Sequence, residues 1–249
     1  MLAPNDRESF KLPPPTTAAL KRPFDIVGSI VGLVLLLPIF LVIAIIIKID
    51  SPGPVFFRQE RVGKGGRLFR IFKFRSMIAD ASHRGTALTV RADRRITRVG
   101  EFLRRSKLDE LPQLVNVLAG DMSLVGPRPE VPEFMSFYTA EQRAVITSMR
   151  PGMTDYAAIL FRDESSLLDQ GGDPVDIYRR EIMPIKFVYY ERYGRDIGIV
   201  NDLRIILATT LLLISGRIPQ WLGVEYKLPD PRVPSPARSG TRPVNRAAA

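Results

Sequence analysis

The hydrophobic pattern of the chain is dominated by one uncharged run, residues 26–47, which reads IVGSIVGLVLLLPIFLVIAIII. A helix over this run would be about 33 Å long, enough to cross a hydrocarbon core of about 30 Å. Pro38 interrupts it near the middle, and a proline there removes a backbone hydrogen bond and costs about 3 kcal/mol in a straight helix. Each arm beside Pro38 would reach about half-way across a bilayer.

Basic residues flank this run on both sides. Lys21 and Arg22 precede it, and a series of lysines and arginines from Lys48 to Arg75 follows it. Because basic flanks favour the cytoplasmic side, the pattern favours a re-entrant helix that bends at Pro38 and returns to the face it entered. A single kinked span remains the alternative, since proline is tolerated in transmembrane helices. A secretory signal fits poorly, because no small-residue cleavage site follows the run.

The rest of the pattern predicts a mainly α-helical chain with a small β-hairpin. Two stretches with interleaved aromatic and basic residues, VFFRQERV and RLFRIFKFR, flank the Gly-rich residues 63–66, which is a hairpin signature. Residues 131–150 and 174–194 have a mostly helical composition. A second apolar run, residues 205–215, is too short to span a bilayer and indicates a core helix or an interfacial helix.

These patterns divide the chain into four segments. Residues 1–20 are predicted to be a flexible N-terminal arm, and residues 21–50 a re-entrant membrane helix. Residues 51–226 are predicted to form a cytoplasmic catalytic domain. Residues 227–249 are rich in Pro, Arg, Ser and Ala and lack an apolar period, which is typical of a disordered basic tail.

Charge and composition narrow the chemistry. The chain has 36 Lys and Arg against 26 Asp and Glu, a net charge of +10, which predicts an anionic partner: nucleic acid, anionic lipid or a phosphorylated substrate. The absence of cysteine excludes disulfides, thiolate zinc sites and cysteine nucleophiles. The only histidine, His83, is predicted to lie in a surface loop. A metal ion would therefore be a hard cation held by carboxylates, such as Mg²⁺.

Two adjacent carboxylates, Asp109 and Glu110, stand beside a group of bases in the stretch LRRSKLDELPQL. Four apolar residues follow at helical spacing, namely Leu111, Leu114, Val115 and Leu118. The spacing predicts a helix with Asp109 as its N-cap, Glu110 at its first position and Pro112 in its first turn. The positive end of the helix would favour ionised carboxylates, leaving Asp109 free to attack an electrophile or to bind a metal. Taken alone, the pair is explained better by an ordinary helix start.

Prolines fix two arginines further along the chain. Pro127 and Pro129 flank Arg128, and Arg150 precedes Pro151. A guanidinium held in this way has little entropy to lose when it binds a phosphate with two hydrogen bonds. A simple rigid turn is the alternative. Carboxylates and held arginines beside a membrane segment indicate chemistry on a phosphate at a bilayer surface.

Several motifs in order, KRPFDIVGS, SPGPVFFRQERVG, FKFRSM, LRRSKLDELPQLVNVLAGDMSLVGPRPE and RPGMT, resemble the bacterial sugar transferases known as small monotopic phosphoglycosyl transferases. The resemblance covers about residues 21–215. It implies transfer of a phosphosugar from a nucleotide-activated sugar to polyprenyl (undecaprenyl) phosphate with release of the nucleoside monophosphate. It also implies a requirement for Mg²⁺, a re-entrant helix, and a place in the bacterial inner membrane facing the cytoplasm.

The resemblance assigns roles to individual residues. Asp109 matches the nucleophile of the family and Glu110 its partner in metal binding or proton transfer. The Pro-Arg-Pro motif of the family, close to the nucleotide, falls on residues 127–129, and Arg104 matches an arginine of the phosphate site. The basic residues that open the membrane helix match Lys21 and Arg22, with Asp25 following in register.

Two stretches depart from the family pattern. The helix break is often Ser-Pro in the family, but here it is Leu37-Pro38, which leaves the depth of the bend open. After RPGMT this chain continues as DYAAILFRDESS, residues 155–166, which differs from the stretch found in many members and leaves the sugar open. A membrane-anchored nucleic-acid-binding protein and a scaffold subunit are the competing interpretations, although neither explains the Asp109–Glu110 pair. The polymer and the oligomeric state, including a homo-oligomer, also stay open.

Overall fold

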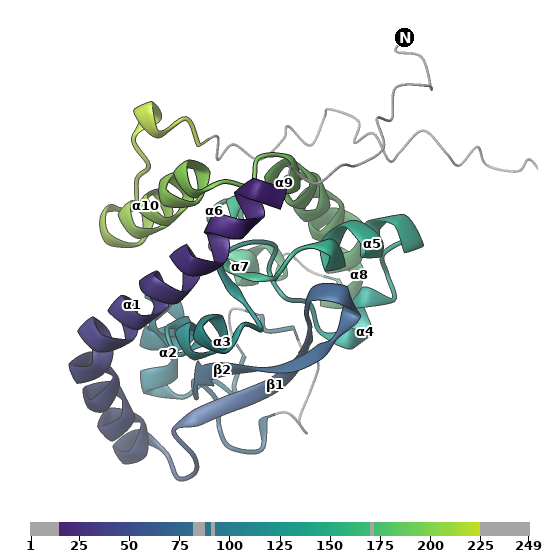
Figure 1. Cartoon of the computed structure of the whole chain (residues 1–249). Helices are drawn as coiled ribbons and strands as arrows, with labels where there is room; N and C mark the ends of the chain where they lie inside the picture. Colours follow the sequence, from purple (N-terminus) through teal and green to yellow (C-terminus); the bar gives the residue numbers. More distant parts are fainter. Residues whose placement is uncertain (1–14, 82–87, 91–92, 170–171, 225–249) are drawn as a thin grey trace, which may run out of the picture.

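The computed structural model describes residues 15–81, 88–90, 93–169 and 172–224, with side chains from residue 20. Over these residues the chain is mainly helical, with small sheets and one long N-terminal helix (Figure 1), which confirms the predicted composition of the fold. The helices are α1 (Pro15–Asp50), α2 (Arg98–Arg105), α3 (Gln113–Ala119), α4 (Pro132–Met135), α5 (Ala140–Ser148), α6 (Tyr156–Leu160), α7 (Glu164–Leu167), α8 (Pro174–Ile177), α9 (Met183–Arg195) and α10 (Ile199–Ser215). The strands are β1 (Phe56–Val62), β2 (Leu68–Phe74), β3 (Ser123–Val125) and β4 (Gly152–Thr154).

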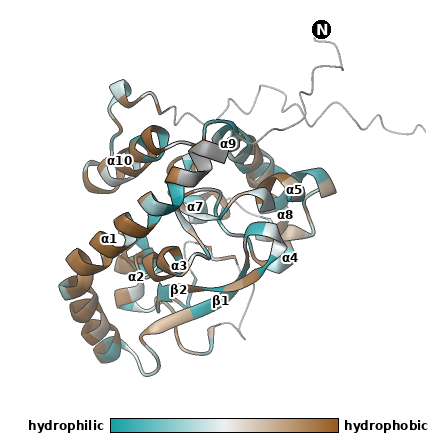
Figure 2. Cartoon of the chain, in the orientation of Figure 1, coloured by the Kyte–Doolittle hydropathy of each residue, from teal (hydrophilic) through white to brown (hydrophobic). Residues whose placement is uncertain are grey.

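Helix α1 is longer than the predicted membrane segment. It begins at Pro15, inside the predicted arm, and continues without interruption to Asp50 with Pro23 and Pro38 inside it. Figure 1 shows α1 changing direction part-way along its length, as expected for a proline kink in which both arms stay helical. The stretch Leu20–Asp50 is long and apolar enough to cross a membrane by length and composition. Figure 2 shows most of α1 as hydrophobic.

The first described turns of α1 are tied to the rest of the protein. Arg22 donates to the carbonyl oxygens of Val117 (Nη1, 2.6 Å) and Leu118 (Nη2, 3.0 Å), and thus caps the C-terminal end of α3. Lys21 forms an ion pair with Asp202 on α10. The two basic residues that precede the apolar run therefore bind protein groups in this structure, on two different elements.

Asp25 ties α1 to a third element. This buried carboxylate accepts hydrogen bonds from Ser123 Oγ (2.9 Å) and from the backbone N–H of Leu124 (3.0 Å) on β3. One turn later Gly28 lets the two elements approach closely, because a Cβ atom there would lie 2.6 Å from Leu124 Cδ1. The orientation of α1 is thus set by hydrogen bonds and close packing against β3.

The hairpin of β1 and β2 forms in the predicted place. The two strands are antiparallel, with Phe57 opposite Lys73 and Arg61 opposite Phe69. Asn116 on α3 extends the edge of β2, since its Oδ1 accepts from Phe72 N (2.8 Å) and its Nδ2 donates to Arg70 O (2.9 Å). This contact fixes α3, and the carboxylate pair that precedes it, against the hairpin.

A second, shorter pair of strands joins two motifs that lie far apart in the sequence. β3 and β4 are parallel, with Ser123 opposite Gly152 and Val125 opposite Thr154. The backbones meet so closely beyond β3 that a Cβ on Gly152 would lie 2.0 Å from Gly126 N. Only glycine fits such an approach. The pairing brings the residue 126–129 loop beside the start of β4, a contact that the sequence pattern did not predict.

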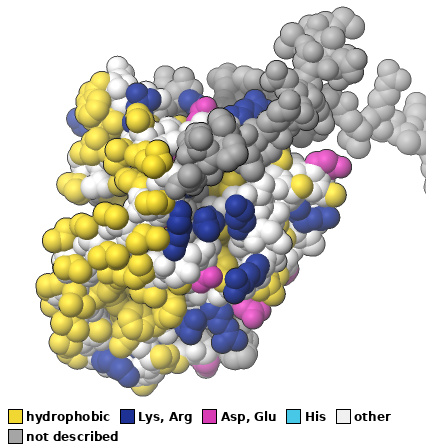
Figure 3. Space-filling model, in the orientation of Figure 1, with side chains coloured by type: hydrophobic (Ala, Val, Ile, Leu, Met, Phe, Trp, Pro, Cys, Tyr) yellow, Lys and Arg dark blue, Asp and Glu magenta, His cyan; other side chains and the backbone are white. Residues whose placement is uncertain are grey.

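The protein has an extensive apolar surface on one side. Helix α10 buries Ile205 and Ala208 in the core but exposes Leu203, Leu207 and Ile214. Most of α1 also exposes its large apolar side chains. In Figure 3 these side chains gather along one side of the molecule, over α1 and α10, next to an area with many Lys and Arg side chains.

Candidate active site

The carboxylate pair lies in a tight turn rather than at the start of α3. Residues Leu108–Glu110 form a single 3-10 turn, which Lys107 precedes in the left-handed conformation (φ 58°). Helix α3 begins only at Gln113, with Pro112 as its N-cap. The prediction that Asp109 is the N-cap of an α-helix is therefore wrong. The i to i+3 hydrogen bond from Leu111 N to Leu108 O (3.3 Å) winds this stretch more tightly than an α-helix.

The buried face of α3 also differs from the predicted one. Leu114 and Val117 are buried, whereas Val115 (39% exposed) and Leu118 (38% exposed) are not. The predicted apolar face included Val115 and Leu118 because it considered helical spacing alone. Packing against the hairpin and α1 rotates the helix so that polar Asn116 takes a buried position. There its side chain forms hydrogen bonds with the backbone of β2.

Asp109 is buried, with only 5% of its surface exposed. Its Oδ1 atom has no hydrogen-bond partner. Burial raises the pKa of the Asp109 carboxyl, the charge of Glu110 adds to this, and Lys73 and Arg104 act in the opposite direction. The expectation of a carboxylate at the positive end of an α-helix is thus corrected, because Asp109 lies in a 3-10 turn and lines a pocket, where burial opposes its ionisation.

Glu110 is held by cations on both sides. Arg128 donates from Nη1 to Oε2 (3.0 Å) and from Nη2 to Oε1 (2.6 Å), and Lys73 Nζ donates to Oε1 (2.8 Å). Burial alone would raise the pKa of the Glu110 carboxyl, but Arg128 and Lys73 outweigh it and hold the pKa well below its usual range. The two carboxylates therefore have different environments.

Two cations of the site, Lys73 and Arg61, were not predicted from the sequence, and they lie on one face of the hairpin. Burial lowers the pKa of Lys73 to about 8, against the opposing effect of Glu110. Arg61 donates from Nη1 to Pro129 O (3.0 Å), and its buried Nε has no partner. The alternation of side chains along the strands could have indicated that these two cations face inward. Lys73 and Arg61 share the face of the hairpin that carries buried Phe69 and Ile71.

Asp155 fixes the loop that carries Arg128. Its buried carboxylate accepts hydrogen bonds from the backbone N–H groups of Arg128 (3.2 Å to Oδ2) and Ala158. Burial raises the pKa of Asp155 to about 6 despite these hydrogen bonds. Pro127 is held from the other side, where its carbonyl accepts from Gly152 N (2.9 Å). The backbone around Arg128 is thus fixed by hydrogen bonds as well as by its two prolines.

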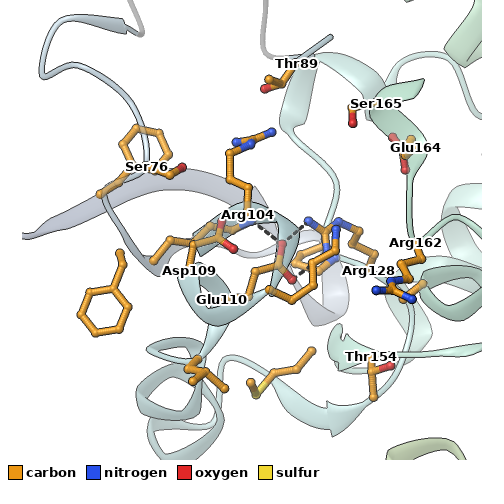
Figure 4. A pocket seen from close by; sticks show the side chains of 18 of the residues that line it. Ser76, Thr89, Arg104, Asp109, Glu110, Arg128, Thr154, Arg162, Glu164 and Ser165 are labelled. Atoms are coloured by element: carbon orange, nitrogen blue, oxygen red, sulfur yellow. Dashed lines mark hydrogen bonds and ion pairs between the residues drawn. The ribbon is translucent and has the colours of Figure 1, made fainter. Parts of the chain in front are cut away.

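These groups line a large pocket with a volume of about 1850 Å³. In Figure 4, Asp109, Glu110 and Arg104 lie on one side, Arg162 and Glu164 on the other, and Arg128 between them. Apolar residues of α1 and α10 also line the pocket, including Phe24, Leu35, Leu36, Ile206 and Leu213. Of the four buried side-chain polar atoms without a partner among the described residues, three belong to pocket-lining residues: Asp109 Oδ1, Arg61 Nε and Tyr190 OH. The pocket is therefore built for a polar ligand that an apolar chain can accompany.

The remaining predicted residues have different positions. Arg104 lines the pocket, and so does Pro129. Arg150 does not line it, since its Nε donates to Gly120 O (3.1 Å) at the end of α3. Pro38 lies in α1 outside the pocket lining. His83 and residues 227–249 lie outside the described residues.

The donor set was tested for a divalent cation. Across the residues that the structure describes, no group of three or more His, Asp or Glu side chains gathers as a metal site. Mg²⁺, however, usually binds one or two carboxylates and completes its shell with water and substrate phosphates. The unpartnered Oδ1 of buried Asp109, next to Glu110, fits that arrangement.

Comparison with known proteins gives a family match over most of the chain. The model of the family described as "Bacterial sugar transferase" matches residues 16–216. The chain is 44% identical over 154 residues to the UDP-N-acetylgalactosamine-undecaprenyl-phosphate N-acetylgalactosaminephosphotransferase of Aeromonas hydrophila, a match that covers 60% of this chain and 36% of that protein.

Two further relatives match over more of their own length. The chain is 40% identical over 207 residues to the exopolysaccharide production protein PSS of Rhizobium leguminosarum, covering 77% of this chain and 94% of that protein. It is 39% identical over 197 residues to the UDP-glucose:undecaprenyl-phosphate glucose-1-phosphate transferase of Caulobacter vibrioides, covering 78% of this chain and 70% of that protein. These matches favour the transferase interpretation over a nucleic-acid-binding protein or a scaffold.

Proposed function

This chain belongs to the bacterial sugar transferase family, and on that premise we propose that it transfers a sugar 1-phosphate from a UDP-sugar to undecaprenyl phosphate. The products are UMP and a polyprenyl-diphosphate-linked sugar, on which a polysaccharide or glycoconjugate is built. One observation carries the proposal: buried Asp109 presents an unpartnered oxygen to a pocket lined both by cations and by the apolar side chains of α1 and α10. A diphosphate and a lipid chain need these two kinds of wall.

Asp109 is the nucleophile in this proposal. Its carboxylate oxygen attacks the phosphorus that carries the sugar, and the bond from that phosphorus to the oxygen of UMP breaks. UMP leaves with the electron pair, and a phosphosugar stays on Asp109. A phosphate oxygen of the lipid then attacks the same phosphorus and releases the Asp109 carboxylate, which gives ping-pong kinetics.

The cations around Asp109 allow one anion to approach another. Arg104, Lys107 and Lys73 each lower the pKa of the Asp109 carboxyl, so their charges act on the site of attack. Cations fixed by the fold stabilise the charge that develops on the phosphate without having to reorganise. Arg128 and Lys73 also hold Glu110, so that this carboxylate keeps a fixed place beside the nucleophile.

Asp109 and Glu110 are the residues that would hold Mg²⁺ together with substrate phosphates. The ion would supply positive charge to the diphosphate. Glu110 accepts hydrogen bonds from Arg128 and Lys73, so its share in metal binding depends on how it divides its oxygens between the ion and these two cations.

The membrane arrangement is part of the proposal. Helix α1 enters the cytoplasmic leaflet of the inner membrane and returns at Pro38, so that both of its ends face the cytoplasm. The kink in α1 supports this arrangement, as does the apolar surface over α1 and α10 (Figure 3). The lipid phosphate would then reach the pocket past the apolar side chains of α1 and α10 that line it.

The test uses the detergent-solubilised full chain with Mg²⁺ and a panel of UDP-sugars. With one UDP-sugar and no lipid acceptor, we expect one equivalent of UMP per enzyme and a phosphosugar adduct on the peptide that contains Asp109. Addition of undecaprenyl phosphate should then start continuous release of UMP. Asp109→Asn should abolish both the first equivalent of UMP and the continuous release. Turnover that requires both substrates at once, with no adduct, would refute the covalent route and leave the carboxylates as metal ligands.

A further inference from the structure

We propose that residues 155–166 form the wall of the pocket that selects the sugar, and that Glu164 accepts a hydrogen bond from a hydroxyl group of the transferred sugar. This inference rests on the proposed function. It assigns a role to residues 155–166, one of the two stretches that depart from the family pattern. The sugar that this wall fits is neutral and carries free hydroxyl groups.

The wall is held in place by contacts at both ends. Asp155 caps α6 and accepts from Arg128 N, which couples the start of the segment to the Arg128 loop. Beyond α6, Arg162 donates from Nη1 to Leu212 O (3.0 Å) on α10. Figure 4 shows Arg162, Glu164 and Ser165 on the side of the pocket that faces Arg128 and the carboxylate pair.

Glu164 is a hydrogen-bond acceptor that a buried lysine holds in place, and not a freely moving surface carboxylate. Its Oε2 lies 2.6 Å from Nζ of Lys186, whose side chain is only 3% exposed, while the Glu164 side chain itself keeps 26% exposure to the pocket. Burial alone would raise the pKa of Glu164, but Lys186 outweighs it and the pKa is lowered. An ionised carboxylate only accepts hydrogen bonds. The ion pair with Lys186 uses Oε2, and among the described residues no hydrogen bond or ion pair engages Oε1, which leaves that atom available to a ligand.

Tyr190 is a complementary donor among the residues that line the pocket. Its hydroxyl is fully buried, lines the pocket and has no hydrogen-bond partner. Burial, followed by the charge of Asp155, raises the pKa of this hydroxyl well above its usual value, so it keeps its proton. A sugar hydroxyl both donates and accepts, and it can therefore satisfy a carboxylate acceptor and a phenol donor that the protein leaves open.

The position of Glu164 in the pocket favours the transferred sugar over the ribose as the ring that it binds. Glu164 lines the same pocket as Arg128 and Asp109, on the side that faces them (Figure 4). The transferred sugar is bonded to the phosphate that Asp109 attacks, whereas a second phosphate separates that atom from the ribose. A uronic acid should be rejected, because its carboxylate would meet the charge of Glu164.

The test is a double-mutant cycle between the protein and the donor. Wild type and Glu164→Gln are assayed for kcat/KM with the preferred UDP-sugar and with its deoxy analogues, one hydroxyl removed at a time. Loss of one hydrogen bond to a charged group should lower kcat/KM of the wild type by about tenfold to a hundredfold for one deoxy sugar. Glu164→Gln should show a similar loss with the parent sugar and no further loss with that analogue.

Matched measurements decide between the alternatives. Glu181→Gln changes an exposed carboxylate outside the pocket lining and should keep the wild-type profile. Inhibition by UMP should be equal in wild type and Glu164→Gln. The ratio of kcat/KM with UDP-glucuronic acid to kcat/KM with the neutral donor should rise in the variant. If Glu164→Gln does not fold, Tyr190→Phe replaces it, since that change removes only a hydroxyl without a protein partner.

Two outcomes would overturn the inference. Additive losses with every deoxy sugar would show that Glu164 does not contact the transferred sugar. Coupling found only with a 2′-deoxyribose donor would place Glu164 at the nucleoside instead. Both outcomes require an enzyme that turns over a UDP-sugar, so they are distinct from failure of the proposed function, in which no UDP-sugar yields UMP.

Discussion

Arg128 binds Glu110 with both arms of its guanidinium, through contacts of 3.0 Å from Nη1 to Oε2 and 2.6 Å from Nη2 to Oε1. The two prolines around Arg128 were predicted to present it to a phosphate. In the structure its fork is already used to orient a carboxylate that lies next to the proposed nucleophile. A phosphate would therefore meet Arg128 as one member of a charged pair, with about one third of its side chain exposed to the pocket.

Arg128→Lys should lower activity strongly and should also lower the thermal midpoint of unfolding, because the lost hydrogen bond to Glu110 is present in the folded protein. Lysine keeps the charge but cannot form two parallel hydrogen bonds with a carboxylate. Loss of one charge-assisted bond of about 1.5–3 kcal/mol corresponds to a fall in kcat of about tenfold to a hundredfold. UMP release and differential scanning fluorimetry on the same preparation measure both quantities.

Arg150→Lys is the matched control for that variant. Arg150 also precedes a proline, but it donates to Gly120 O and does not line the pocket. Its replacement should change the thermal midpoint more than kcat. Near-normal kinetics of Arg128→Lys, or equal loss of kcat in the two variants, would show that residues 126–129 serve only as a turn.

Asp109→Asn should be at least as stable as the wild type although it is inactive. The wild-type carboxylate is buried beside Glu110 and has an oxygen without a partner, so its charge costs free energy in the folded state. The neutral amide removes that cost. Thermal unfolding of the two proteins in one detergent at pH 7 provides the measurement. A clear loss of stability in Asp109→Asn would indicate that the carboxylate has a structural partner.

Both ends of α1 should lie on the cytoplasmic side. The chain has no native cysteine, so single cysteines can be introduced at Thr17, near the start of α1, and at Lys64, at the exposed tip of the hairpin. Neither should react with a membrane-impermeant thiol reagent in intact cells, and both should react after the membrane is permeabilised. Labelling of only one site in intact cells would establish a true transmembrane span.

Asp155 should make stability depend on pH between pH 5 and pH 7. Its pKa is raised from 3.8 to about 6 in the folded protein, so the folded state binds this proton more tightly than the unfolded chain. The contribution of Asp155 to the free energy of unfolding is fully present below pH 3.8 and is lost as the pH rises through about 6. Relative to Asp155→Asn, the wild type should therefore gain about 1 kcal/mol from pH 7 to pH 5.

Thermal midpoints of both proteins at pH 5, 6 and 7 in one detergent test this expectation. The difference between the two proteins matters, because other carboxylates titrate over the same range in both. Parallel curves for wild type and Asp155→Asn would show that the carboxyl of Asp155 has an ordinary pKa in the folded protein.

The sequence by itself determined the features that depend on neighbouring residues. The uncharged run with Pro38 predicted the long apolar helix, and the alternation around residues 63–66 predicted the hairpin. The adjacent Asp109 and Glu110, and Arg128 between two prolines, were singled out by sequence, and the structure places them in one pocket. Each of these follows from local periodicity or from the covalent geometry of proline, which act over a few residues.

Tertiary structure alone decided which groups meet at the site. Lys73 reaches Glu110 across 37 residues of sequence, and Asp25 reaches Ser123 across 98. Such pairings depend on the packing of whole elements, and so do the burial that raises the pKa of Asp109 and the rotation of α3 that exposes Val115. No local pattern encodes them, because the free energy of burial and of a charge pair depends on what the fold places nearby.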